Sequence, residues 1–164
     1  MKVYGVTGWK NSGKTHLVER LVAEITRRGL SVSTVKHAHH ATEIDHPGRD
    51  SFRHREAGAC EVLVASPVRW ALMHELRGDR EPPLTELLHR LSPVDLVLIE
   101  GYKREAHPKI EAHRAETGRP FLAEGNRTIR AVASDSAPKG LDVPVLDLND
   151  TGAIADFILK EAGL

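Results

Sequence analysis

Length, composition and charge indicate an ordinary globular chain. It has 164 residues, of which 40% are hydrophobic and 28% charged, and its formal net charge at pH 7 is +0. This length suits one core, so we expect a single domain over residues 1–164. The balanced charge does not favour nucleic acid or a membrane surface as a partner, and no apolar run approaches the roughly 18 residues of a membrane span.

The first 30 residues place a glycine-rich loop between a strand and a helix. Residues 1–7 read as a short buried strand, and apolar side chains recur at helical spacing from 17 to 25, before Gly29 stops the helix. Between them the chain matches G-x-x-x-x-G-K-[ST], the P-loop. The predicted nucleotide-binding residues are Gly8, Trp9, Lys10, Asn11, Ser12, Gly13, Lys14, Thr15 and His16.

Each fixed position of this motif has a physical role. Gly8 and Gly13 allow a sharp turn and a close approach to phosphate, while loop N–H groups and the helix N-terminus attract the anion. Lys14 can reach the β- and γ-phosphates, and Thr15 can place its hydroxyl on Mg²⁺. The alternative is a Gly/Ser turn that matches the pattern by chance, but the strand–loop–helix order favours the P-loop.

The rest of the chain alternates between strands and helices. We therefore expect an α/β, P-loop NTPase-like fold, with a mostly parallel central sheet and helices on both faces. The chain has a single cysteine, Cys60, so it cannot form an internal disulfide. The apolar residues that follow Cys60 in the sequence indicate a core thiol. The N-terminus enters a strand directly, without a signal peptide, so we expect the cytoplasm. Further strands are predicted at 31–36, 60–65, 69–74, 95–99, 109–113, 129–133 and 143–146, and helices at 50–57, 84–91 and 151–162.

The run D-L-V-L-I-E-G at 95–101 resembles a Walker B strand. In a parallel sheet, ligands bind beyond the carboxyl ends of the strands. Glu100 lies at that end, whereas Asp95 lies about 16 Å back along the strand. We therefore assign Glu100 to the Mg²⁺ shell or its activated water, as the candidate catalytic residue, and Asp95 to a structural role. Gly101 would let the backbone pass close to phosphate or metal; alternatively, Glu100 merely ends a core strand.

A histidine-rich segment follows the second predicted strand. Three interpretations stay open for it: a metal site, contacts to an anion or a partner, or an ordinary loop. Asp50 could cap the next helix, and either Asp45 or Asp50 could approach Mg²⁺. The candidates for anion or partner contacts are His37, His39, His40, Asp45, Arg49, Asp50, Gly101 and Lys103.

Several motifs together resemble one family. They are the P-loop, K-H-x-H-H at 36–40, P-G-x-D-S at 47–51, E-G-Y-K at 100–103, and P-K-I-E at 108–111 with Arg114. This combination resembles the molybdopterin-guanine dinucleotide biosynthesis adaptor family, MobB, over residues 1–160. The resemblance implies a homodimeric protein that binds GTP and Mg²⁺ and hydrolyses GTP weakly. It also implies a molybdenum cofactor guanylyltransferase as partner, with molybdopterin as a further candidate ligand and the strand pair from Cys60 to His74 as a candidate dimer contact.

Guanine specificity lacks a clear motif. The usual guanine reader is [NT]-K-x-D, whose Asp accepts from the base, and the chain has no clear copy of it. Asp135, which follows the strand predicted at 129–133, is the candidate acceptor. The alternative is a turn residue in the segment 134–138, where Ser and Asp are favoured by turn chemistry.

Two other classes of function stay open. One is a metal-delivery P-loop GTPase that would use His37, His39 and His40. The other is a small-molecule kinase or ATP-dependent ligase, because dethiobiotin synthetase has a similar apolar strand followed by E-G. A purely structural module is not favoured, since it would not need Lys14 and Thr15. The leading hypothesis is an accessory protein, and the sequence leaves open whether its weak GTPase activity matters.

Overall fold

The computed structural model describes residues 1–38 and 44–164. Its contacts divide the chain into two compact units, residues 1–38 with 92–164 and residues 39–91. Whether these units behave as the single expected domain stays a prediction, and each is described by itself. The predicted strands and helices are present, with their ends within two residues of those expected. None of the helices in the described residues is long and apolar enough to cross a membrane.

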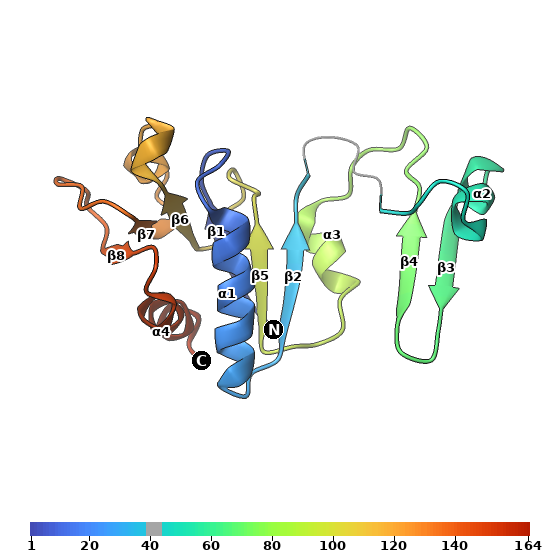
Figure 1. Ribbon diagram of the computed structural model, residues 1–164, viewed down its shortest axis with the longest axis horizontal. Coiled ribbons are helices and arrows are strands. Elements are labelled where there is room, and N and C mark those ends of the chain that lie inside the picture. The colour runs from blue at the N-terminus through green and yellow to red at the C-terminus, as the bar shows by residue number, and fades with distance from the viewer. Residues whose placement is uncertain (39–43) are drawn as a thin grey trace. The chain divides into compact units, whose positions relative to one another are not determined.

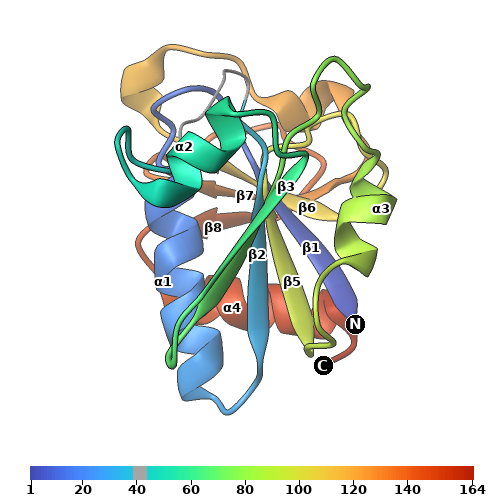
Figure 2. The ribbon, with the colours of Figure 1, turned by 90° about the vertical axis from the view of Figure 1, so that its right-hand side faces the viewer.

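Six strands form the sheet of the first unit, in the order β2-β5-β1-β6-β7-β8 (Figure 1). All its described strand pairs are parallel, so the expected α/β class is confirmed. Figure 2 shows the twist of this sheet from β2 to β8. Because β1 lies between β5 and β6, residues that follow those two strands can flank the P-loop. The strands are β1 (Lys2–Thr7), β2 (Val32–Lys36), β5 (Leu96–Glu100), β6 (Lys109–His113), β7 (Ile129–Ser134) and β8 (Val145–Asp147).

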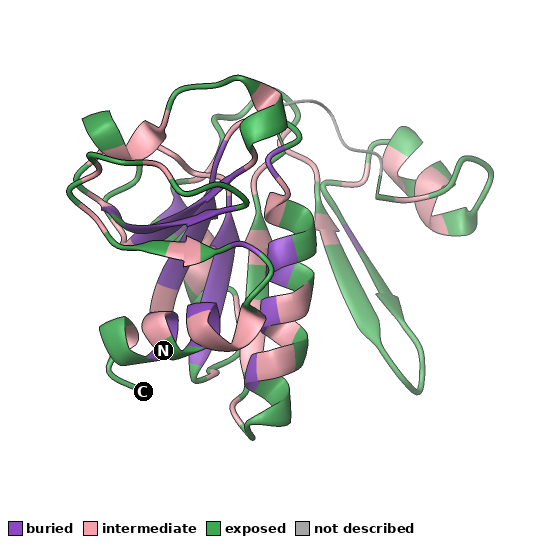
Figure 3. Cartoon of the chain, turned by 60° about the vertical axis from the view of Figure 1, so that its left-hand side comes forward, coloured by how far each residue is buried: buried purple, intermediate pink, exposed green. Residues whose placement is uncertain are grey.

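Two amphipathic helices, α1 (Lys14–Arg27) and α4 (Thr151–Ala162), pack against one face of this sheet. Alternate strand residues point toward them because side chains alternate between the two faces of a strand. Figure 3 shows the buried stripe of α1 and the buried sheet strands. Asp95 has the expected structural role, since its Oδ2 accepts hydrogen bonds from Ser31 N–H and Oγ–H at 2.7 and 2.6 Å. The core includes Tyr4, Val6, Leu17, Leu21, Ile25, Leu96, Leu98, Ile110, Ala131, Ile154 and Ile158.

Short 3₁₀ helices, η1 (Ala115–Thr117) and η2 (Leu122–Gly125), follow β6. The side chain of Glu111 points to the sheet face opposite α1, where its two carboxylate oxygens accept the N–H groups of Leu122 and Ala123, each at 2.9 Å. The segment after β6 is therefore fixed by a buried carboxylate. In this unit, the short helix η2 lies on the face of the sheet opposite α1.

The second unit contains an antiparallel hairpin, β3 (Glu61–Ala65) with β4 (Trp70–His74), and the short helices α2 (Asp50–Glu56) and α3 (Leu84–His89). Cys60 is exposed, so the predicted core thiol is wrong. The apolar run suggested a buried position, but the strand that follows Cys60 belongs to a two-stranded sheet, which cannot bury both of its faces. Figure 3 shows this hairpin largely exposed. The predicted cap is also wrong, because Arg49 occupies the N-cap position of α2 and Asp50 begins the helix.

Candidate nucleotide-binding site

The P-loop connects β1 to α1, and its backbone requires glycine at the first position. Gly8 has φ 147°, and a β-carbon there would lie 2.3 Å from the carbonyl oxygen of Ala112 and 2.4 Å from Ser12 Oγ. Gly13 (φ 88°) and Asn11 (φ 65°) also adopt positive φ. The buried Ser12 Oγ has no hydrogen-bond partner among the described residues. The loop is therefore a tight turn that ends on the N-terminus of α1, the geometry of an anion cradle.

Lys14 begins α1 and folds back over the loop. Its Nζ donates a hydrogen bond to the carbonyl oxygen of Trp9 at 2.6 Å. Burial lowers the pKa of Lys14, the nearby Lys103 lowers it further, and Glu100 acts in the opposite direction. A phosphate beside Nζ would favour the charged form, so this position suits an anionic ligand.

Thr15 and Glu100 meet at the carboxyl ends of β1 and β5. Thr15 Oγ1 donates to Glu100 Oε1 at 2.8 Å, and Lys36 Nζ lies 3.5 Å from the same oxygen. Glu100 is only 9% exposed. A hydroxyl and a carboxylate are the hard oxygen ligands that Mg²⁺ prefers, commonly completed by phosphate oxygens and waters. These two residues therefore fit a magnesium ion held together with a nucleotide.

Arg114, which the sequence did not single out as a site residue, lies against the P-loop. It follows β6, and its Nε lies 3.1 Å from the point where a β-carbon on Gly13 would sit. The sequence placed Arg114 in a family motif with residues 108–111 but gave it no role at the loop. Parallel pairing of β6 with β1 brings it there from about a hundred residues away. A pocket of about 350 Å³ is lined by Asn11, Gly13, Lys14, Thr15, His16 and Arg114.

Asp135 follows β7 and contacts the segment after β6. Its Oδ1 accepts the N–H of Ala115 at 2.9 Å, and its Oδ2 lies 3.8 Å from Nη1 of Arg114. The carboxylate therefore helps to hold Arg114 beside the P-loop. Its predicted contact with guanine stays a prediction.

Trp9 contributes a large planar side chain beside the loop. Its indole N–H donates to the carbonyl oxygen of Pro120 at 2.8 Å. Lys103 Nζ lies 4.4 Å and Arg119 Cζ 5.5 Å from the centre of the indole ring. Lys103 thus lies next to the P-loop, and its predicted contact with an anion or a partner stays a prediction.

The other predicted contacts divide between the two units. Gly101 has φ 98°, and a β-carbon there would lie 3.2 Å from Cβ of His37, so glycine here permits the close approach of His37. The His37 ring lies 4.5 Å from that of Tyr102. His39 and His40 lie outside the described residues. Asp45, Arg49 and Asp50 belong to the second unit. In the described part of the chain, no group of three or more His, Cys, Asp or Glu gathers to hold a metal.

A P-loop after β1, an acid at the end of neighbouring β5 and an all-parallel sheet define the class: this is a protein of the P-loop NTPase-like fold. The family model for "Molybdopterin guanine dinucleotide synthesis protein B" matches residues 3–135. The chain belongs to the MobB family, which confirms the resemblance of its motifs.

Curated relatives and solved structures agree with this assignment. The chain is 42% identical over 155 residues to the molybdopterin-guanine dinucleotide biosynthesis adapter protein of Escherichia coli strain K12, covering 93% of this chain and 88% of that protein. The Haemophilus influenzae adapter protein is also 42% identical, over 154 residues that cover 94% and 85%. The crystal structure of a MobB homolog from Bacillus stearothermophilus matches with TM-score 0.76 and 31% identity, over 99% of each chain.

Proposed function

We propose that this protein binds GTP with Mg²⁺ and acts as an adapter in molybdopterin guanine dinucleotide biosynthesis. Relatives at 42% identity carry that adapter name. The observation that carries the proposal is the 2.8 Å contact between Thr15 and Glu100 beside Lys14. It places the hydroxyl of the P-loop threonine against a buried carboxylate with which it could share a metal ion, an arrangement that a purely structural module would not need.

In this proposed site, each residue would contact a different part of the bound nucleotide and metal. Lys14 would exchange the carbonyl oxygen of Trp9 for the β- and γ-phosphates, and Thr15 with Glu100 would hold the metal. Mg²⁺ neutralises phosphate charge when bound. Arg114 adds a cation on the side of the loop formed by Gly13. Hydrolysis would be phosphoryl transfer to water, and we propose that it is weak and secondary to the adapter role.

The proposed partner is the guanylyltransferase that joins GMP to molybdopterin. The adapter would bind GTP beside this enzyme and assist the delivery of nucleotide or cofactor. Neither step requires rapid turnover by the adapter itself. We place both proteins in the cytoplasm.

We also propose that the protein is a homodimer. On one face of the β3–β4 hairpin, Leu63 lies opposite Leu72, and Ala65 opposite Trp70. Leu63, Leu72 and Trp70 are 61%, 43% and 68% exposed. Apolar groups gathered on one face are typical of an interaction surface. Sedimentation of a Trp70→Ser variant should show a monomer where the unaltered chain gives a dimer. A monomeric unaltered chain would contradict the proposal and leave this face to the enzyme partner.

The nucleotide proposal is tested by calorimetric titration with GTP and ATP, each with and without Mg²⁺. We expect GTP to bind more tightly than ATP, and Lys14→Ala to abolish binding. Lys160→Ala is the matched control, because Lys160 is an exposed lysine in the last turn of α4. A preference for ATP would favour a kinase or ligase. Absence of nucleotide binding in the unaltered chain would contradict the proposal.

A further inference from the structure

The last residue of β6, His113, is a buried polar side chain that the nucleotide chemistry above does not use. It is only 5% exposed. β1 ends at Thr7, which pairs with Glu111, so His113 lies past the end of β1, where the P-loop begins. Buried polar groups in proteins are hydrogen-bonded, and the partners of His113 show which part of the chain it holds in place.

A hydrogen bond and a ring contact join His113 to the segment that follows β6. Its Nε2 lies 3.1 Å from the carbonyl oxygen of Arg119. Because a carbonyl oxygen can only accept, Nε2 carries the proton and donates it. The ring of His113 lies 4.0 Å from the ring of Phe121, and its Nδ1 lies 3.4 Å from the hydroxyl of Ser134 on β7. His113 thus ties residues 119–121 to the sheet.

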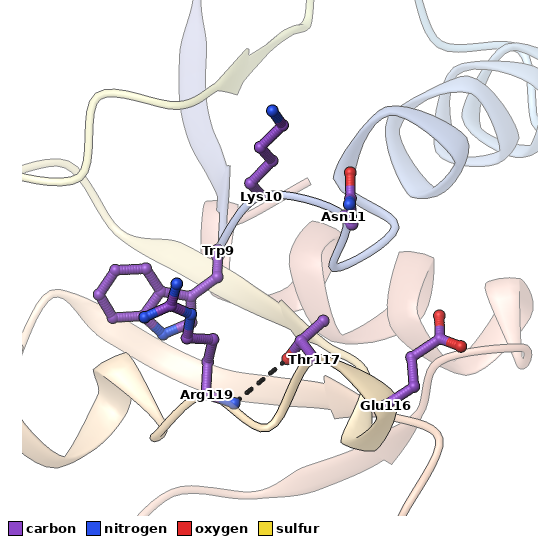
Figure 4. A pocket seen from close by; sticks show the side chains of 6 residues that line it. All are labelled: Trp9, Lys10, Asn11, Glu116, Thr117 and Arg119. Carbon is purple, nitrogen blue, oxygen red and sulfur yellow. Dashed lines mark hydrogen bonds between the residues drawn. The ribbon is translucent and has the colours of Figure 1, made fainter.

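The same short stretch holds Trp9 of the P-loop. The carbonyl oxygen of Pro120 accepts the indole N–H of Trp9 at 2.8 Å. The guanidinium carbon of Arg119 lies 5.5 Å from the centre of the indole ring, and Figure 4 shows the Arg119 side chain folded against Trp9. Residues 119–121 therefore form a bridge between His113 and Trp9.

Trp9 in turn contacts the lysine of the P-loop. Its carbonyl oxygen accepts the hydrogen bond from Lys14 Nζ at 2.6 Å. Trp9 is also the second residue of the loop, directly after Gly8, so the position of its ring limits the paths open to the loop backbone. The contacts therefore run without a break from His113 through the bridge and Trp9 to Lys14.

Both ends of the segment after β6 have anchors of their own. Asp135 accepts the N–H of Ala115 at 2.9 Å near its start. Glu111 accepts the N–H of Leu122 at 2.9 Å near its end. The contacts of His113 lie between these two anchors. Their loss should therefore loosen the bridge without releasing the whole segment.

We propose that His113 is a positioning residue for phosphate binding, which holds Trp9, and with it the P-loop, in the shape that receives the phosphates. The inference rests on the proposed function, because it concerns the affinity of the same loop for nucleotide. His113 touches neither phosphate nor metal in this account. It acts through residues 119–121 and Trp9.

The tether of Trp9 has two opposite effects on nucleotide affinity. The carbonyl oxygen of Trp9 competes with phosphate for Lys14, which disfavours binding. The tether also orders the loop before the ligand arrives, so less conformational entropy is lost on binding. The competition concerns one hydrogen bond, whereas the ordering concerns several residues. We therefore expect the tether to raise the affinity for nucleotide.

The link between His113 and Trp9 is tested without a ligand. The chain has two tryptophans, and Trp9→Phe identifies the indole N–H signal of Trp9 in the nuclear magnetic resonance spectrum. We expect His113→Leu to shift this signal and to speed the exchange of its proton with solvent, because Pro120 is no longer held in place. His113→Gln should preserve the signal, since a glutamine amide can also donate to Arg119.

His107→Leu is the matched control. His107 is a partly buried histidine just before β6, and its Nε2 has no hydrogen-bond partner among the described residues. The same substitution there removes no bond to the bridge, so the indole signal of Trp9 should stay unchanged. If His113→Leu does not fold, His113→Asn replaces it, because the shorter amide stays polar but does not reach Arg119.

The effect on phosphate binding is measured by calorimetric titration with GTP and Mg²⁺. We expect His113→Leu to weaken binding by about twofold to thirtyfold, the range typical of residues that act through others. His113→Gln should restore most of the affinity, and His107→Leu should leave it unchanged. Trp9→Phe removes the donor to Pro120 but keeps a ring. Combined with His113→Leu, it should therefore cost less than the product of the two separate losses.

The outcomes separate this inference from the proposed function. The inference is overturned by an unshifted Trp9 signal in His113→Leu, by equal affinities of His113→Leu and His107→Leu, or by tighter GTP binding in His113→Leu. Lower thermal stability of His113→Leu with unchanged GTP affinity would show a purely structural role and also overturn it. If the unaltered chain binds no GTP, the proposed function fails, while the Trp9 signal still decides whether His113 positions the loop.

Discussion

Replacing Asp135 with alanine distinguishes two roles for this carboxylate. One oxygen accepts the N–H of Ala115 at 2.9 Å, and the other lies 3.8 Å from the guanidinium of Arg114. These contacts indicate that Asp135 positions Arg114 beside the phosphates. A guanine reader would instead contact the base. The two roles predict different nucleotide preferences.

The expected loss of nucleotide affinity in Asp135→Ala follows from these two contacts. A hydrogen bond from a backbone N–H to a carboxylate contributes about 1.5–3 kcal/mol, and partial exposure places this one at the lower end. The longer, partly exposed ion pair with Arg114 adds about 0–1 kcal/mol. Their sum of about 2 kcal/mol corresponds to roughly a 30-fold change in an equilibrium constant. Since phosphates are common to both nucleotides, we expect Asp135→Ala to weaken GTP and ATP alike, by up to that factor.

Calorimetry of Asp135→Ala with GTP·Mg²⁺ and ATP·Mg²⁺ is the assay. Asp142→Ala serves as the control, since Asp142 is exposed and lies in the loop before β8. Thermal unfolding of both variants shows whether any loss of binding reflects loss of fold. A fall in GTP affinity alone, with ATP affinity unchanged, would refute the positioning role and identify Asp135 as the guanine reader.

Three further predictions test the loop, the metal ligand and the packing. Gly8→Ala places a β-carbon 2.3 Å from the carbonyl oxygen of Ala112, so we expect thermal unfolding to show that the free energy of unfolding falls by about 1–3 kcal/mol. The loss should be smaller for Gly29→Ala, where no described atom lies within 4 Å of the added β-carbon. Glu100→Gln retains an acceptor for Thr15 but removes the negative charge. GTP affinity measured by calorimetry should then lose its dependence on Mg²⁺. An unchanged dependence would show that Glu100 is not a metal ligand. Burial, together with the nearby Lys109, lowers the pKa of His107 to about 4. Between about pH 6.5 and pH 4, His107 is therefore protonated in the unfolded chain but neutral in the folded chain. Urea melts should therefore show stability falling by up to about 1.4 kcal/mol per pH unit toward pH 4, less steeply in His107→Leu; equal slopes would contradict this.

The P-loop and its acid could be predicted from sequence because each is encoded locally. Gly8 to Thr15 specify a turn whose shape depends on neighbouring residues, and Glu100 ends a fully buried strand. Placing them together needed only the rule that parallel strands present ligands at their carboxyl ends. The 2.8 Å contact of Thr15 with Glu100 agrees with that reasoning.

The residues around the loop could not be predicted in the same way. Arg114 belongs to a family motif and Arg119 to none, but neither position indicates a contact with the P-loop. Both reach the loop only because β6 pairs with β1. Sequence periodicity does not specify which strands become neighbours. The error at Cys60 has a related cause, since an apolar run predicts a strand but does not reveal whether another element covers it.

Lys14 connects both sides of the site. Its ammonium donates to the carbonyl oxygen of Trp9. Burial and, next to it, Lys103 lower the pKa of Lys14, and Glu100 acts in the opposite direction. Phosphate beside Lys14 would offset the repulsion between these two lysines and favour the charged form of Lys14. Added salt should therefore weaken the attraction between phosphate and the P-loop.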